Sequence, residues 1–193
     1  MGLGAYNIPL FLTGMRLVLA LVFPIALVTV IPFDVPMFHA AVAICFLALG
    51  LTDMLDGYLA RRYQQETLLG KLLDPVADKF LVFSTAVTLV YLQKIFFYWA
   101  IVVIARDVFV MGLREVALSS GFSVPVAWHG KLKTLVQLGY LGLVIAYPHV
   151  TCAQSAYLSS GIYLLFIISL VITVYSAIGY YRDFYARYAA RIL

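Results

Sequence analysis

Four aspartates between positions 53 and 78 have the types and the spacing that metal-assisted chemistry needs. Asp53 and Asp56 are three residues apart, and Asp74 and Asp78 are four apart. Side chains at these spacings project from one face of a helix, so the sequence predicts two acidic pairs on two helices. Carboxylate oxygens are the ligands that Mg²⁺ and Mn²⁺ prefer, and two such pairs could bracket two ions about 3.5–4 Å apart.

Small residues and an arginine follow the first acidic pair. Gly57 and Ala60 lie one turn beyond it and leave a strip with almost no side chain, where a ligand could lie against the helix backbone. Arg61 ends this strip with a guanidinium that suits a phosphate group. The surrounding sequence is apolar, and four carboxylates inside membrane helices would cost on the order of 10 kcal/mol without cations or water. That cost favours a functional site.

Composition places these residues in a membrane protein. The chain has 193 residues, of which 64% are hydrophobic and only 11% are charged. We therefore expect an all-α integral membrane protein, with residues 1–193 forming a single domain and no nucleic-acid partner. Its apolar stretches predict six transmembrane helices, which a short N-terminal interfacial helix could precede. The predicted spans cover about residues 10–31, 37–58, 69–92, 96–118, 132–147 and 157–180.

Basic residues gather at one set of span ends, which predicts an inner-membrane protein with both termini and the acidic pairs on the cytoplasmic side. Trp99 and Trp128 fit belts at the two membrane interfaces.

The pattern D-x2-D-G-x2-A-R-x8-G-x3-D-x3-D resembles the signature of the CDP-alcohol phosphatidyltransferase family. All eight defining positions are present, namely Asp53, Asp56, Gly57, Ala60, Arg61, Gly70, Asp74 and Asp78. The resemblance implies a membrane enzyme that transfers a phosphatidyl group from a CDP-lipid to an alcohol and that works as a homodimer. It implies two Mg²⁺ or Mn²⁺ ions on the four aspartates, with Asp78 also acting as the general base. It further implies that the CDP-lipid contacts Asp56, Gly57, Ala60, Arg61 and Gly70.

A second group of charges bears on the alcohol that accepts the phosphatidyl group. Arg114, Lys131 and Lys133 lie at the same ends of two predicted helices, where they would form a cationic pocket for an acceptor that carries a phosphate. Further candidates for this pocket are Arg16, Arg106 and Arg182. The segment 104–115, followed by 130–134, resembles family members that use CDP-diacylglycerol as donor and sn-glycerol 3-phosphate as acceptor.

Three alternatives stay open. Each lysine alone fits an ordinary cytoplasmic basic residue, and Asp107 with Arg114, seven residues apart on one helix face, fits a structural ion-pair network. A cardiolipin synthase, or another family member with a different acceptor, would share the same acidic motif. A cation transporter could also use intramembrane aspartates, but it would place them on broken helices in related halves of the chain, a pattern the sequence lacks.

Overall fold

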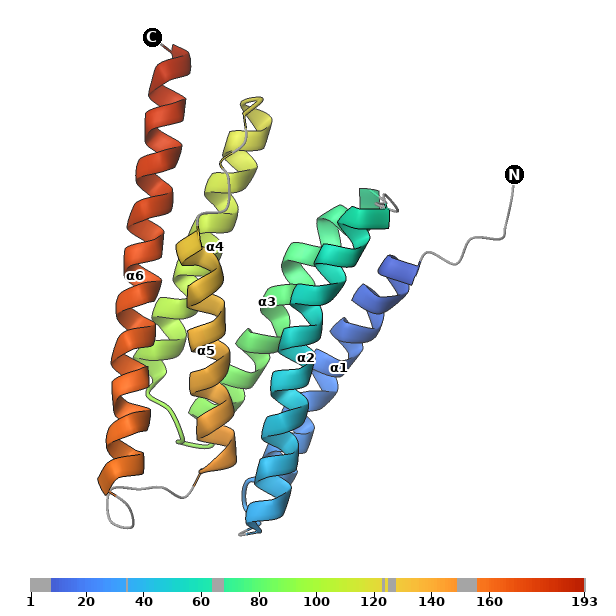
Figure 1. Cartoon of the computed structure of the whole chain (residues 1–193), viewed down its shortest axis with the longest axis vertical. Coiled ribbons are helices and arrows are strands. Elements are labelled where there is room, and N and C mark those ends of the chain that lie inside the picture. The colour runs from blue at the N-terminus through green and yellow to red at the C-terminus, as the bar shows by residue number, and fades with distance from the viewer. Residues whose placement is uncertain are drawn as a thin grey trace. The chain divides into compact units, whose positions relative to one another are not determined.

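The computed structural model describes residues 8–33, 35–63, 68–122, 124, 128–148 and 156–192. Side chains are not described at residues 8–13, 16, 52–63, 68–78, 129, 131, 156–159 and 190–192. Within the described ranges the chain forms six helices and no strand, which confirms the all-α prediction (Figure 1). The helices are α1 (Ile8–Val30), α2 (Pro36–Tyr63), α3 (Leu68–Tyr91), α4 (Phe97–Ser119), α5 (Trp128–Ala146) and α6 (Ala156–Ile192).

The surfaces of these helices fit a lipid environment. In the described part of the chain one helical stretch, Ser160–Ala189 of α6, is long and apolar enough to cross a membrane by length and composition. Shorter apolar stretches occupy Leu17–Val30, Pro36–Leu51, Lys79–Tyr91 and Leu132–Ala146. Large apolar side chains such as Ile25, Ile44 and Ile101 are more than half exposed, an arrangement that water disfavours and lipid does not.

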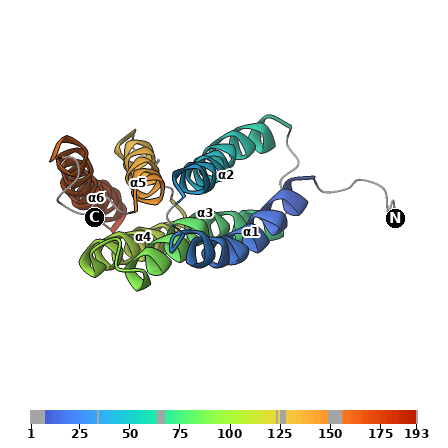
Figure 2. The ribbon, with the colours of Figure 1, turned by 90° about the horizontal axis from the view of Figure 1, so that it is seen from below.

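The chain divides into two compact units, and unit 1 comprises Met1–Ile95 and Leu141–His149. Here α1 packs along α3, α1 also contacts α2, and α2 contacts α3 (Figure 2). Phe23 of α1 stacks on Phe46 of α2 with ring centroids 5.6 Å apart. The Ser84 hydroxyl of α3 donates a hydrogen bond of 3.0 Å to the Ala20 carbonyl of α1. Because Ala20 has almost no side chain, α1 and α3 approach closely enough for that bond.

Unit 2 comprises Phe96–Tyr140 and Val150–Leu193, so it holds α4, α6 and most of α5. Buried polar side chains join these three helices. The Trp99 Nε1 of α4 donates to the Ser169 Oγ of α6 at 2.6 Å, and the Gln137 Nε2 of α5 donates to the Thr173 Oγ1 of α6 at 3.0 Å. The interface-belt prediction for Trp99 is therefore wrong, because this indole is fully buried and packs against Tyr140.

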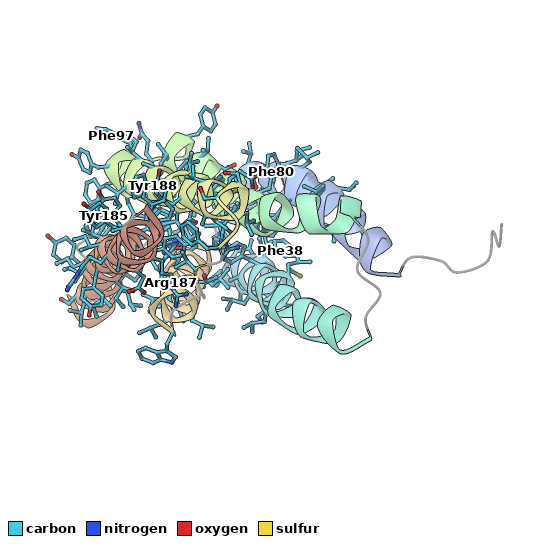
Figure 3. The ribbon with its side chains drawn as sticks, turned by 90° about the horizontal axis from the view of Figure 1, so that it is seen from above. Phe38, Phe80, Phe97, Tyr185, Arg187 and Tyr188 are labelled. Atoms are coloured by element: carbon cyan, nitrogen blue, oxygen red, sulfur yellow. The ribbon has the colours of Figure 1, made fainter. Side chains whose placement is uncertain are left out.

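The last helix is longer than the sequence predicted. We expected it to end near residue 180, but α6 continues to Ile192. Tyr180, at the expected end, and Phe184, in the extension, are buried in a cluster with Val110 and Ala117 of α4. Figure 3 shows Tyr185 and Tyr188 on the same part of α6, and the Tyr188 ring stacks on that of Phe184. Aromatic packing against α4 therefore supports the extension.

Each of α3 and α4 is followed by a residue whose backbone adopts the left-handed conformation. Gln93, at φ 58°, follows α3, and the Lys94 N–H donates to the Leu89 carbonyl at 2.8 Å. Gly121, at φ 76°, holds the same place after α4. These bonds cap carbonyls that a helix end otherwise leaves without donors, so each helix stops at a defined residue.

Candidate active site

The two acidic pairs lie on neighbouring helices of unit 1. Asp53 and Asp56 belong to α2, and Asp74 and Asp78 belong to α3, as their spacing predicted. The α3 helix continues through Pro75, so the second pair stays one turn apart on one helix. The pairs lie in the part of α2 that ends at Tyr63 and the part of α3 that begins at Leu68, near the connection between the two helices (Figure 1). The four carboxyl groups themselves lie outside the described side chains.

The other motif positions follow the same helices. Gly57, Ala60 and Arg61 lie on α2, and Gly70 lies on α3. The side chains of these positions are outside the described part of the chain, so the predicted contacts with a CDP-lipid stay predictions. The same applies to two of the predicted acceptor contacts, Arg16 on α1 and Lys131 on α5.

The predicted metal site rests on the four motif aspartates. Among the side chains that the structure describes, no three histidine, cysteine, aspartate or glutamate residues gather closely enough to hold a metal ion. The four motif aspartates lie outside that set. Four carboxylates supplied by two contacting helices form a donor set whose chemistry fits a hard divalent cation such as Mg²⁺ or Mn²⁺.

Three charged residues of the predicted acceptor region meet in unit 2. Asp107 of α4 accepts a hydrogen bond from the Lys133 ammonium of α5 through its Oδ1. The same Oδ1 accepts from Arg106 Nη1 at 2.9 Å. The Asp107 and Lys133 side chains are 2% and 1% exposed, whereas that of Arg106 is 12% exposed. Lys133 therefore lies in the interior of unit 2, away from solvent.

The remaining predicted cations lie closer to the surface. Arg114, on the last turns of α4, is partly exposed, and Arg182 of α6 is exposed. One open alternative was a structural ion pair of Asp107 with Arg114, whereas the ion pairs found among the described side chains of unit 2 join Asp107 to Arg106 and Lys133. The sequence feature that could have indicated this pairing is Asp107 itself, a carboxylate near the middle of a largely apolar helix, which needs a cationic partner.

Comparison with known proteins decides the family. The profile of the CDP-alcohol phosphatidyltransferase family matches residues 6–182. The chain belongs to this family. The match covers all of the acidic motif and all six helices up to the extended end of α6, so the resemblance found in the motif holds for nearly the whole chain.

Three curated relatives carry the same name. A protein of Haemophilus influenzae is 36% identical over 179 residues, which cover 91% of each chain, and is named CDP-diacylglycerol–glycerol-3-phosphate 3-phosphatidyltransferase. Proteins of the same name from Escherichia coli and Shigella sonnei are 36% identical over 182 residues, which cover 91% of this chain and 93% of theirs.

Proposed function

We propose that this CDP-alcohol phosphatidyltransferase transfers the phosphatidyl group of CDP-diacylglycerol to sn-glycerol 3-phosphate and releases CMP. The observation that carries the proposal is the 36% identity to relatives named for this reaction, which extends over 91% of the chain. The complete acidic motif and the cationic residues of α4 and α5 support it. The proposal gives each group a separate task, with the motif serving the donor and the cations serving the acceptor.

For the donor, Asp53, Asp56, Asp74 and Asp78 would hold two Mg²⁺ or Mn²⁺ ions. When bound, these ions would offset the charge that develops on the pyrophosphate oxygens and on the leaving CMP. Gly57 and Ala60 leave room for the cytidine portion to approach the backbone of α2. Asp56, Arg61 and Gly70 complete this donor subsite, in which the Arg61 guanidinium would bind a phosphate oxygen.

For the chemical step, Asp78 would take the proton from the acceptor hydroxyl. The hydroxyl oxygen then bonds to the β-phosphorus, which carries the diacylglycerol. The bond from that phosphorus to the oxygen of CMP breaks, and CMP leaves with the electron pair. The acceptor's own phosphate would be held by the cationic group of Arg114, Lys131 and Lys133, to which Arg16, Arg106 and Arg182 would contribute further.

We further propose that all six helices cross the cell's inner membrane, that both termini and the site face the cytoplasm, and that the protein is a homodimer. The apolar stretches of α1, α2, α3 and α5 and the basic residues at one set of helix ends support the first two statements. Homodimerisation rests on the family resemblance.

The test is CMP release from CDP-diacylglycerol by the purified full-length protein, with glycerol 3-phosphate, phosphatidylglycerol, inositol phosphate or no acceptor. We expect release with glycerol 3-phosphate, its loss with a chelator and its return with Mg²⁺ or Mn²⁺. Release with phosphatidylglycerol in place of glycerol 3-phosphate would identify a cardiolipin synthase. A protein that releases no CMP with any acceptor, but carries cations across a vesicle membrane, would contradict the proposal.

A further inference from the structure

The cluster of Arg106, Asp107 and Lys133 has an arrangement that a simple cationic pocket does not require. Both cations donate to the same oxygen, Asp107 Oδ1. Burial of charged groups is unfavourable unless they are paired. An ion pair between Asp107 and Lys133 would by itself give each of these two buried charges a partner of opposite sign. The structure adds a second cation to that carboxylate, and this cation is the one nearest the surface.

The two cations differ in what they can offer a ligand. The Lys133 side chain is 1% exposed, and its ammonium is directed to a carboxylate that is itself buried. The Arg106 side chain keeps 12% of its surface, and its Nε is buried without a hydrogen-bond acceptor in the part of the chain that the structure describes. Guanidinium has five N–H donors in a rigid fork, so a guanidinium that gives one bond to a carboxylate can still bind a phosphate.

The position of Lys133 is itself fixed by α5. Gln137 lies one turn further along the same helix and donates to Thr173 Oγ1 of α6 at 3.0 Å. Gln137 is 2% exposed and Thr173 is fully buried, so this bond sets the rotation of α5 against α6 inside unit 2. With that rotation, Lys133 is directed at Asp107 of α4.

We propose that Asp107 and Lys133 are positioning residues that hold the Arg106 guanidinium in place for the acceptor phosphate, so that Lys133 acts through Asp107 and not on the substrate. This inference rests on the proposed function and assigns separate tasks within its cationic group. Arg106 binds the phosphate, Asp107 orients Arg106, and Lys133 neutralises Asp107. An arginine held by a carboxylate in this way gives up less rotamer freedom when it binds its ligand.

The experiment is a cycle of variants in which neither Asp107 nor Lys133 is left as an unpaired buried charge. Arg106→Gln leaves the pair of Asp107 and Lys133 intact, and Asp107→Asn with Lys133→Met replaces that pair by neutral side chains of similar shape. The fourth protein carries all three changes. Steady-state KM values for glycerol 3-phosphate and for CDP-diacylglycerol are measured for each protein, together with the thermal unfolding midpoint.

We expect Arg106→Gln to raise the KM for glycerol 3-phosphate roughly tenfold, since it removes a charged hydrogen bond to the phosphate. The neutral pair should raise the same KM several-fold, and the triple variant should match Arg106→Gln, because the pair acts only through Arg106. The KM for CDP-diacylglycerol should stay within about twofold throughout, since the donor binds elsewhere. Ser169→Ala is the control, because it removes the buried hydrogen bond of the Trp99 indole from the same unit and should lower the unfolding midpoint while leaving both KM values unchanged.

The outcomes separate the inference from the proposed function. If the effects multiply, so that the KM of the triple variant exceeds that of Arg106→Gln by the several-fold factor of the neutral pair, Lys133 or Asp107 contacts the acceptor independently of Arg106, and the inference is overturned. An equal rise in both KM values, or an acceptor KM that Ser169→Ala raises as much as the neutral pair does, would show that Asp107 and Lys133 have only a structural role. If the wild-type protein releases no CMP with glycerol 3-phosphate, the proposed function fails first.

Discussion

The hydrogen bond between Gln137 and Thr173 predicts an unequal response to removal of its two partners. Thr173 Oγ1 accepts from Gln137 Nε2 at 3.0 Å and donates to the Ser169 carbonyl at 2.6 Å. Thr173→Val therefore leaves a buried amide N–H without its acceptor. Gln137→Leu leaves the Thr173 hydroxyl still donating to Ser169, so that no buried donor loses its partner.

The expected magnitudes follow from this difference. Interhelical hydrogen bonds in membrane proteins contribute about 0.6 kcal/mol on average and about 1.7 kcal/mol at most. A buried donor left without an acceptor costs about 1–3 kcal/mol. We therefore expect Thr173→Val to lower the free energy of unfolding by about 1–2 kcal/mol and Gln137→Leu to lower it by less than about 1 kcal/mol. The double variant should be more stable than Thr173→Val alone, because it removes the buried Gln137 amide that has lost its acceptor.

The measurement is unfolding of each purified variant in one detergent, followed by the helical circular dichroism signal. For a chain of this length about 1–2 kcal/mol corresponds to a midpoint shift of about 2–8 °C. The order of stability is the sensitive quantity. If Gln137→Leu destabilises the protein as much as Thr173→Val, or if the double variant is the least stable of the three, the unpaired Gln137 amide is not the cause of the destabilisation.

Three further predictions concern the motif and the helix ends. Asp78→Asn should lower turnover by about 100-fold or more while CDP-diacylglycerol still binds, and activity within a few-fold of wild type would remove Asp78 from the role of base. Ala60→Leu should raise the KM for CDP-diacylglycerol about tenfold without changing the unfolding midpoint, because the added side chain occupies the strip reserved for cytidine; an unchanged KM would place the nucleotide elsewhere. Gln93→Gly should raise the free energy of unfolding by about 0.5–1 kcal/mol and Gly121→Ala should lower it by about 1 kcal/mol, since both positions have positive φ. Denaturation of both variants tests this last pair, and opposite signs would contradict it.

Much of the fold could be read from the sequence because apolar stretches and turn residues mark helices directly. The expected first residues of the second, third and fourth helices agree with the observed ones to within one position. The α2 helix runs five residues beyond its expected end at 58, because it continues past the end of the apolar stretch. The motif could be recognised for the same local reason, since its eight positions lie within 26 residues of continuous sequence. Local spacing was sufficient to assign the aspartates to helices.

Contacts between distant segments could not be read in the same way. The alternative pairing of Asp107 with Arg114 came from their shared helix face, whereas the observed partner Lys133 lies 26 residues away on another helix. The partner of the Trp99 indole, Ser169, is 70 residues away, and nothing in the local sequence distinguishes a tryptophan in an interface belt from one that finds a buried hydroxyl. Such pairs depend on helix packing, which periodicity within a single helix does not determine.

The length of α6 has a practical consequence. Its 37 residues extend about 55 Å, while the hydrocarbon core is about 30 Å thick. Even a tilt of about 40° gives a path of only about 39 Å, so at least about 16 Å of the helix must stand in the headgroups or in water. Tyr180 and Phe184 pack against α4, so this contact holds the C-terminal part of α6 in a fixed position. An antibody fragment raised against the C-terminal end of α6 would bind outside a detergent micelle in a fixed orientation. Such a rigid marker is needed to align electron-microscopy images of a protein of only 21.5 kDa.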